Sequence, residues 1–134
     1  MPLIPFEDPK KELAFQGVFR LSVDGTLTFI EDVVKAANGI AFSPDQKTLY
    51  LTDVDPDRLA WLAYDVRREG AVANGRVFFD AMRWKGKWRG APNGIKVDRE
   101  GNLYGAGPEG VYVFAPDGTH IGTIFTGVPT GNLA

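Results

Sequence analysis

Short stretches of sequence recur along this chain, and this repetition is the feature that most constrains its fold. Residues Gly17–Thr26 read GVFRLSVDGT and residues Gly110–Thr119 read GVYVFAPDGT, so the two stretches align position by position without a gap. Asn38–Ile40 recurs as Asn93–Ile95, and a Leu-Tyr pair follows each copy after nearly the same interval. A repeat of about 50 residues that contains several short strands is typical of the blades of a β-propeller.

The strand pattern agrees with the repeats. Short runs rich in Val, Ile, Phe and Tyr are bounded by Gly, Pro, Asp or Asn, which is typical of strands and turns. Asp24-Gly25 and Asp117-Gly118 each separate two such runs and predict hairpin turns, because glycine accepts a positive φ. We expect strands at Gly17–Leu21, Leu27–Ile30, Gly39–Phe42, Thr48–Thr52, Leu59–Val66, Arg76–Phe79, Gly94–Val97, Leu103–Ala106, Val111–Phe114 and Ile121–Phe125.

The predicted fold class is all-β, with residues 1–134 forming one partial propeller domain of about three blades. Propellers typically close with about four to eight blades, so three blades leave strand edges and half of a central channel exposed. Either the chain is part of a longer protein, or two copies complete a ring. Met1–Gln16 is irregular and leads into a mid-blade strand, and Thr130–Ala134 resembles the opening of another blade, which favours the first alternative.

Composition excludes several kinds of site. The chain has no cysteine, which rules out disulfides, thiolate zinc sites and cysteine nucleophiles. A net charge of -2 predicts no attraction to phosphate backbones, so we expect no nucleic-acid partner. No apolar run approaches the length of a membrane helix and Met1–Leu13 has no signal-peptide pattern, so we expect no membrane association and a cytoplasmic location. A leader upstream of this sequence would not be visible in it.

Two Asn-Gly pairs are the first candidates for chemistry. Asn38-Gly39 and Asn93-Gly94 lie at equivalent positions of successive repeats, and equivalent corners of successive blades face the same central channel. Amide oxygens are acceptable ligands for a hard cation such as Ca²⁺, so both side chains could contribute to one axial site. The alternative is that both pairs are plain turns, since Asn-Gly is a common turn dipeptide.

Three other features carry a second candidate role beside a structural one. Asp53 ends a predicted strand, where its carboxylate could face substrate or support the cation ligands, or else close its own turn. His120 is the only histidine and has no Ser or Asp partner in view, so we expect a solvated strand residue. The loop Arg83–Arg89 could stack a base or a sugar, but we expect a connection between blades whose Trp rings cover the edge of the core.

Three segments resemble a known family. Ala37–Tyr50 reads ANGIAFSPDQKTLY and is similar to the P-N-G-I/L-A-F-S-P-D-x-x-x-L-Y of the SMP-30/gluconolactonase (regucalcin-like) family. Pro92–Asp98 reads PNGIKVD and resembles the family's P-D-G-M-x-x-D. Gly107–Phe114 reads GPEGVYVF and resembles its G-P-G-G-V-W-V-F. The motifs occur in the family's order and the resemblance extends over most of Gly17–Ala134.

The resemblance implies a six-bladed propeller that binds one divalent metal, Ca²⁺ or else Zn²⁺ or Mg²⁺, on its axis. Family members hold the metal with a first-blade Glu, the Asn of N-G and the Asp of P-D-G. Asn38 matches the Asn ligand, whereas Asn93 stands at the position of the Asp, which is also regarded as the catalytic base. The first-blade Glu has no counterpart, because neither Glu7 nor Glu12 lies in the family's E-G-P context.

These departures shape the functional expectation. The resemblance implies a metal-dependent hydrolase of sugar lactones or related esters, with a small-molecule lactone as substrate. Two neutral amides at Asn38 and Asn93 replace carboxylate charge, so we expect the isolated chain to bind metal weakly, if at all, and to hydrolyse little. The alternative is a non-catalytic propeller segment that acts as a binding or assembly module, including a homodimer formed through blade edges.

Overall fold

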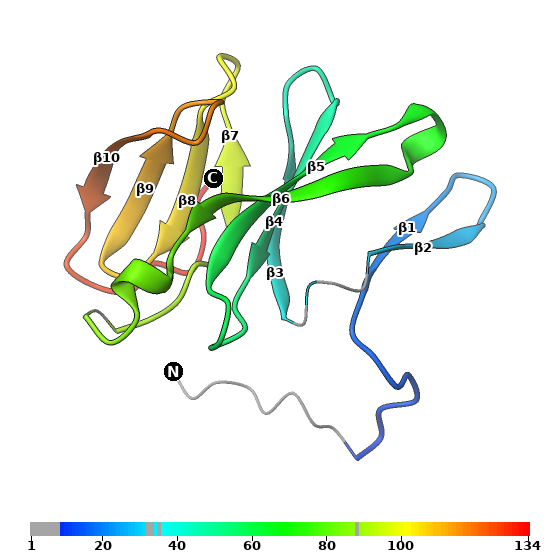
Figure 1. Ribbon diagram of the computed structural model, residues 1–134, viewed down its shortest axis with the longest axis horizontal. Coiled ribbons are helices and arrows are strands. Elements are labelled where there is room, and N and C mark those ends of the chain that lie inside the picture. Colours follow the sequence, from blue (N-terminus) through cyan, green and yellow to red (C-terminus); the bar gives the residue numbers. More distant parts are fainter. Residues whose placement is uncertain (1–8, 32–33, 35, 88) are drawn as a thin grey trace.

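Two successive four-stranded antiparallel sheets form the body of the molecule (Figure 1). The structure is a computed structural model that describes residues 9–31, 34, 36–87 and 89–134. The first sheet contains β3 (Ala37–Phe42), β4 (Thr48–Asp53), β5 (Ala60–Val66) and β6 (Val72–Asp80) in that order. The second contains β7 (Ile95–Val97), β8 (Leu103–Gly107), β9 (Gly110–Phe114) and β10 (His120–Phe125). Each sheet is an up-and-down meander, as expected for a propeller blade.

A separate two-stranded sheet precedes the two blades. It pairs β1 (Val18–Leu21) with β2 (Leu27–Glu31), and β1 matches β9 in the sequence repeat. The hairpin therefore corresponds to the outer half of a preceding blade, and the described residues contain two full blades and half of a third. Gly25 and Gly118 have φ values of 85° and 87°, which confirms both predicted Asp-Gly turns. Of the predicted irregular segment, residues 1–8 lie outside the described residues and residues 9–16 contain no strand.

Every predicted strand is present, and β6 differs most from its predicted bounds. β6 begins at Val72 rather than at the predicted Arg76. The additional residues include the pair Asn74-Gly75, which lies in a bulge of the β5–β6 ladder with Asn74 at a φ of 53°. The Asn74 amide donates to Asp65 at 2.7 Å, and the ring of Tyr64 packs on Gly75. An Asn-Gly pair can therefore lie inside a strand, since a sheet can accommodate one extra residue in a bulge.

The main core lies between the two blades. Trp61 of β5 and Phe114 of β9 are both fully buried, and their ring centroids are 5.1 Å apart. Around them lie buried residues of both sheets, including Tyr50, Ile95 and Leu103. Burial of these rings across the sheet interface fixes the two blades face to face, because large aromatic side chains contribute most of the apolar area in such a core.

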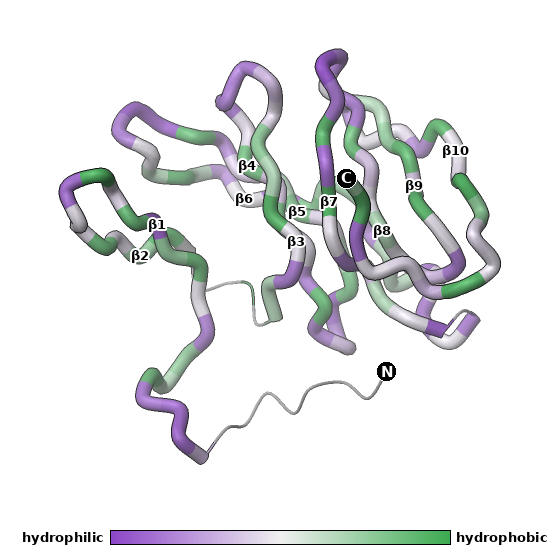
Figure 2. Tube along the Cα trace, turned by 180° about the vertical axis from the view of Figure 1, so that it is seen from behind, coloured by the Kyte–Doolittle hydropathy of each residue, from purple (hydrophilic) through white to green (hydrophobic). Residues whose placement is uncertain are grey.

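A second core covers the opposite face of the first blade. Leu49, Leu51 and Leu62 are buried there, and Val18 of the β1–β2 hairpin packs against them. Arg20 also donates a hydrogen bond to the carbonyl oxygen of Glu69. The hairpin thus lies against the first blade on the side away from the second blade (Figures 1 and 2).

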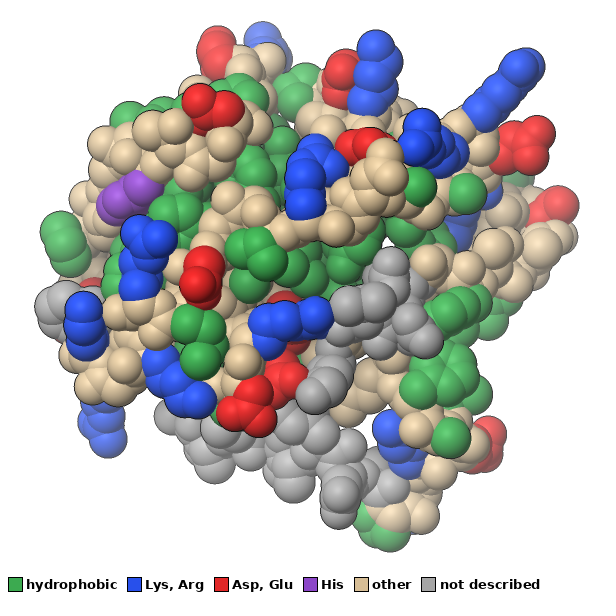
Figure 3. All heavy atoms as spheres, in the orientation of Figure 1, with side chains coloured by type: hydrophobic (Ala, Val, Ile, Leu, Met, Phe, Trp, Pro, Cys, Tyr) green, Lys and Arg blue, Asp and Glu red, His purple; other side chains and the backbone are tan. Residues whose placement is uncertain are grey.

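Helical structure is limited to two short 3₁₀ turns, η1 (Arg68–Gly70) and η2 (Met82–Trp84), within the part of the chain that the structure describes. Among the described residues, no helix has the length and apolar character needed to cross a membrane. Figure 3 shows side chains of both charges interspersed over one face, without a large field of a single sign.

Candidate functional site

The two Asn-Gly corners lie next to each other at the junction of the blades. β3 and β7 are the first strands of their sheets and are in contact along the middle of the molecule (Figures 1 and 2). Asn38 is an exposed residue of β3, and Asn93 is half-buried two residues before β7. The expected juxtaposition of the two corners is therefore present in the described structure.

Gly39 is the point of closest approach between the corners. A Cβ placed on Gly39 would lie 2.5 Å from the Asn93 carbonyl oxygen and 3.1 Å from the Ile95 backbone nitrogen. These are backbone atoms of the neighbouring blade, which cannot rotate away as a flexible side chain could. A residue without a side chain is therefore required for the two strands to approach this closely.

Thr52 bonds the two blades at the same point. Its hydroxyl is fully buried and donates to the Asn93 carbonyl oxygen at 2.8 Å. The Asn93 N–H in turn donates to the Ala106 carbonyl oxygen, also at 2.8 Å. The Asn93 backbone is thus held by both blades, which sets its position relative to Asn38. Sequence reasoning did not select Thr52, because a threonine on a strand carries no signal of what lies across the sheet interface.

Asn132 forms a third corner that sequence reasoning did not select as a site residue. Gly94 donates its N–H to the Gly131 carbonyl oxygen at 3.0 Å, and the Asn132 side chain lies directly against Gly94. The Asn132 Oδ1 atom also accepts from the N–H of Leu133 at 2.9 Å. The third corner thus meets the second much as the second meets the first. The Gly-Asn pair in the segment expected to open another blade was the available signal.

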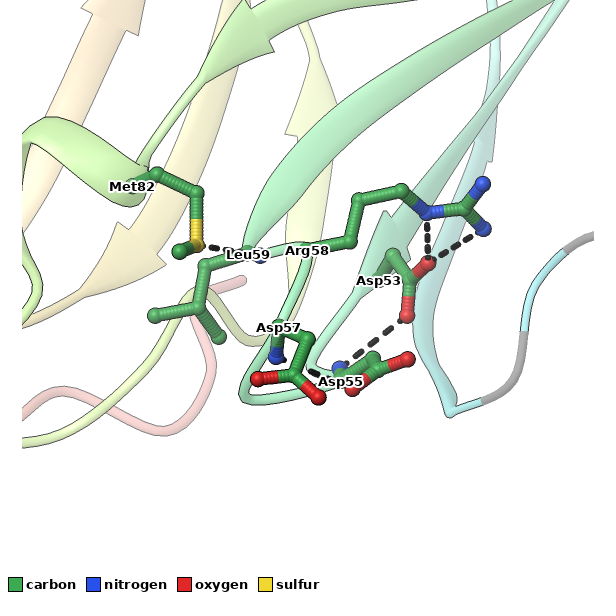
Figure 4. Close-up of polar contacts among 6 residues, drawn as sticks. All are labelled: Asp53, Asp55, Asp57, Arg58, Leu59 and Met82. Atoms are coloured by element: carbon green, nitrogen blue, oxygen red, sulfur yellow. Dashed lines mark hydrogen bonds and ion pairs between the residues drawn. The ribbon is translucent and has the colours of Figure 1, made fainter.

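Asp53 is committed to a network of polar contacts at the end of β4 (Figure 4). Its carboxylate is fully buried and forms an ion pair with Arg58 at 2.6 Å, while the Arg58 Nε–H donates to the same oxygen at 2.8 Å. The other oxygen accepts from the Asp55 N–H at 3.1 Å. These contacts fit the turn-closing role among the two alternatives for Asp53, and a role toward substrate stays a prediction.

Asp98 has the structural role that its turn position suggests. The side-chain amide of Asn102 donates to it at 2.9 Å and the Asn102 N–H donates at 2.8 Å. These hydrogen bonds, the Asn102 side chain first, lower the pKa of the Asp98 carboxyl below its ordinary value, because they favour the charged form. The carboxylate therefore fixes the β7–β8 turn.

His120 and the basic loop lie far out along the blades, at strand β10 and helix η2. His120 is exposed and its Nε2 lies 3.0 Å from the Thr123 hydroxyl, as expected for a strand residue without a catalytic partner. Trp84 stacks on Tyr112 with ring centroids 4.2 Å apart, which confirms that a Trp ring of this loop covers the edge of the core. The second Trp of the loop, Trp88, lies outside the described residues.

The donor set at the corners is made of amides. Within the described residues, His, Asp and Glu side chains form no cluster of three that could hold a metal ion. Glu12 is exposed on the segment before β1, and Glu7 lies outside the described residues. The amide oxygens of Asn38 and Asn93 are suitable in type for a hard cation, but they are neutral and few.

Comparison with known proteins identifies the family. The SMP-30/gluconolactonase/LRE-like region matches residues 4–131. A gluconolactonase of Zymomonas mobilis is 36% identical over 120 residues, which cover 88% of this chain and 34% of that protein. A solved Xanthomonas campestris gluconolactonase superposes with a TM-score of 0.80 at 35% identity, over 92% of this chain and 39% of that one. A calcium-binding regucalcin of Agrobacterium tumefaciens gives 0.70 at 26% identity, over 87% and 39%.

These relatives are much longer than the chain, which spans only 34% to 39% of their length. The two blades and the preceding hairpin therefore correspond to part of a propeller, in agreement with the repeat count in the sequence. The chain belongs to the SMP-30/gluconolactonase/LRE-like family, as a partial propeller of that family.

Proposed function

We propose that this chain forms part of a lactonase-type hydrolase that opens sugar lactones or related esters with the help of a divalent cation. The observation that carries the proposal is the contact between the two Asn-Gly corners, held by the Thr52 hydroxyl on the Asn93 carbonyl oxygen. The similarity to gluconolactonases of Zymomonas mobilis and Xanthomonas campestris supports the reaction class.

Asn38 and Asn93 are the residues of this chain that would hold the cation, through their amide oxygens. Ca²⁺ accepts such ligands, and the similarity to a calcium-binding regucalcin supports this choice over Zn²⁺ or Mg²⁺. A bound divalent cation would supply Lewis-acid polarisation of the lactone carbonyl and a more acidic bound water. Since both amides are neutral, this chain by itself would bind the cation weakly.

The remaining roles of this chain are positional. Thr52 holds the Asn93 backbone against the first blade, and Gly39 permits the close approach of the two strands. Asn93 cannot act as a general base near neutral pH, because an amide does not accept a proton there. The proton acceptor for hydrolysis must therefore be a different residue, with a carboxylate or imidazole side chain. Asp53 would contribute by holding Arg58 near the end of β4.

Hydrolysis of glucono-δ-lactone, followed by proton release in a pH-stat and corrected for the spontaneous rate, tests the proposal. We expect the chain to stay near the background rate, and Asn93→Asp to add a calcium-dependent component. Gln46→Glu is the matched control, because it makes the same amide-to-carboxylate change on an exposed turn. A calcium-dependent gain in both variants, or in neither, would contradict a role for Asn93 at the site.

One observation favours a second candidate function, assembly without catalysis. Apolar side chains remain exposed on the outer faces of both blades: Ile40 is 55% and Val77 56% exposed on the first, and Ile124 is 56% exposed on the second. Exposed apolar surface of this kind marks interaction sites. The module would then bind a further blade or a second copy of the chain. Mass measurement in solution decides the homodimer version, which a monomer at micromolar concentration would exclude.

A further inference from the structure

A cavity of about 240 Å³ lies at the outer end of the junction between the blades, away from the Asn-Gly corners on β3 and just before β7. One side comes from the end of β6 and from η2, and the other from β9 and β10. Four aromatic rings form most of its wall, those of Phe79, Trp84, Tyr112 and Phe125. Because both complete blades contribute to it, the cavity does not depend on any further blade.

The aromatic wall is held in place by the core. Trp84 lies nearly parallel to Tyr112, with an interplanar angle of 25°, and its ring centroid is 5.2 Å from that of Phe79. Tyr112 is 5% exposed and its hydroxyl donates to the Pro108 carbonyl oxygen at 2.6 Å. A wall fixed in this way needs little ordering when a ligand binds, which lowers the entropic cost of binding.

The polar side chains of the cavity include one cation, Arg83. The Arg83 guanidinium lies 4.7 Å from the centre of the Phe79 ring and has no ion pair with a described carboxylate. His120 and Thr123 complete the lining, and no Asp or Glu takes part in it. The cavity thus combines apolar ring surfaces with one uncompensated positive charge.

We propose that this cavity binds a small aromatic carboxylate, with its ring against the aromatic wall and its carboxylate at Arg83. The volume is below the range of about 300–1,000 Å³ that is usual for drug-sized ligands, so it suits a single ring. A guanidinium binds a carboxylate through two parallel hydrogen bonds, so Arg83 favours a ligand with a carboxylate group. A sugar fits less well, because the described lining offers few polar groups for its hydroxyls.

Titration of the ¹⁵N-labelled chain with benzoate and with neutral benzamide, followed by NMR, tests this proposal. We expect shifts at the Trp84 indole and the Thr123 amide, with benzoate binding more tightly than benzamide. Arg83→Gln should weaken benzoate binding about three- to tenfold and leave benzamide unchanged. Lys85→Gln is the control, since Lys85 belongs to the same loop but faces Asp57 at 3.7 Å and does not line the cavity.

Three results would overturn the proposal. The first is the absence of shifts at Trp84 and Thr123 up to the solubility limit of benzoate. The second is an equal loss of benzoate binding in Arg83→Gln and Lys85→Gln, which would indicate general electrostatic attraction. The third is tighter binding of methyl glucoside than of benzoate, which would assign the cavity to carbohydrate. The outcome does not depend on lactone hydrolysis or on the Asn-Gly corners.

Discussion

Gly39→Ala should destabilise the junction between the blades, because the added side chain would meet backbone atoms of the neighbouring blade. The added Cβ would lie 2.5 Å from the Asn93 carbonyl oxygen and 2.8 Å from the Thr52 hydroxyl. Relief of this overlap requires β3 and β7 to move apart, at a cost of about 1–3 kcal/mol. The same movement would break the Thr52–Asn93 hydrogen bond, which adds about 1 kcal/mol. The expected loss in free energy of unfolding is therefore about 2–4 kcal/mol.

Equilibrium unfolding in urea measures this loss. With a slope of about 2 kcal/mol per molar urea, the midpoint should fall by about 1–2 M. Gly122→Ala is the matched control, because nothing lies within 4 Å of its Cβ position and its φ is not positive. Its midpoint should stay the same or rise slightly, since alanine reduces the freedom of the unfolded chain. Equal midpoints for the two variants would refute the close approach of the corners.

Two further predictions concern carboxylates. Asp53→Asn should cost about 2 kcal/mol, because it weakens the contact of a fully buried carboxylate with the partly exposed Arg58. Asp65→Asn should change the urea midpoint much less, because the ion pair of Asp65 with Arg76 is exposed; equal losses in the two variants would contradict this. Asp98 has a lowered pKa, so its contribution to stability is present above about pH 4 and is lost as the pH falls through the folded-state pKa. The urea midpoints of the unaltered chain and of Asp98→Asn should therefore differ less at pH 3 than at pH 6. A difference that does not change with pH would show that the charge of Asp98 does not cause the stabilisation.

Much of the fold was predictable from the sequence because propeller blades are local structures. Within each sheet, every strand pairs with the next one along the chain, so period-two patterns and Asp-Gly turns are enough to locate the ladders. The first half of β6 was missed, and only the packing of Tyr64 on Gly75 shows that Asn74-Gly75 lies in a bulge. The repeat also predicted correctly that Asn38 and Asn93 occupy matching corners.

The parts that could not be predicted depend on contacts between blades. Nothing in the sequence around Thr52 indicates that its hydroxyl bonds to a residue in another sheet. The cavity at Arg83 likewise combines residues from β6, η2, β9 and β10, which only the packing of the two blades brings together. For Asp53, by contrast, the sequence indicated two alternative roles, toward substrate or in its own turn. The contact of Asp53 with Arg58 fits the role in the turn.

A calcium titration of the ¹⁵N-labelled chain, with the side-chain amides of Asn38 and Asn93 as reporters, tests the central claim most directly. The account predicts that both amides shift together, that half-saturation lies at about 1 mM or above, and that Asn93→Asp tightens binding at least about tenfold. Gln46→Glu should leave the titration unchanged. Micromolar binding by the unaltered chain, or shifts that leave Asn38 and Asn93 unaffected, would contradict a cation site shared by the two corners.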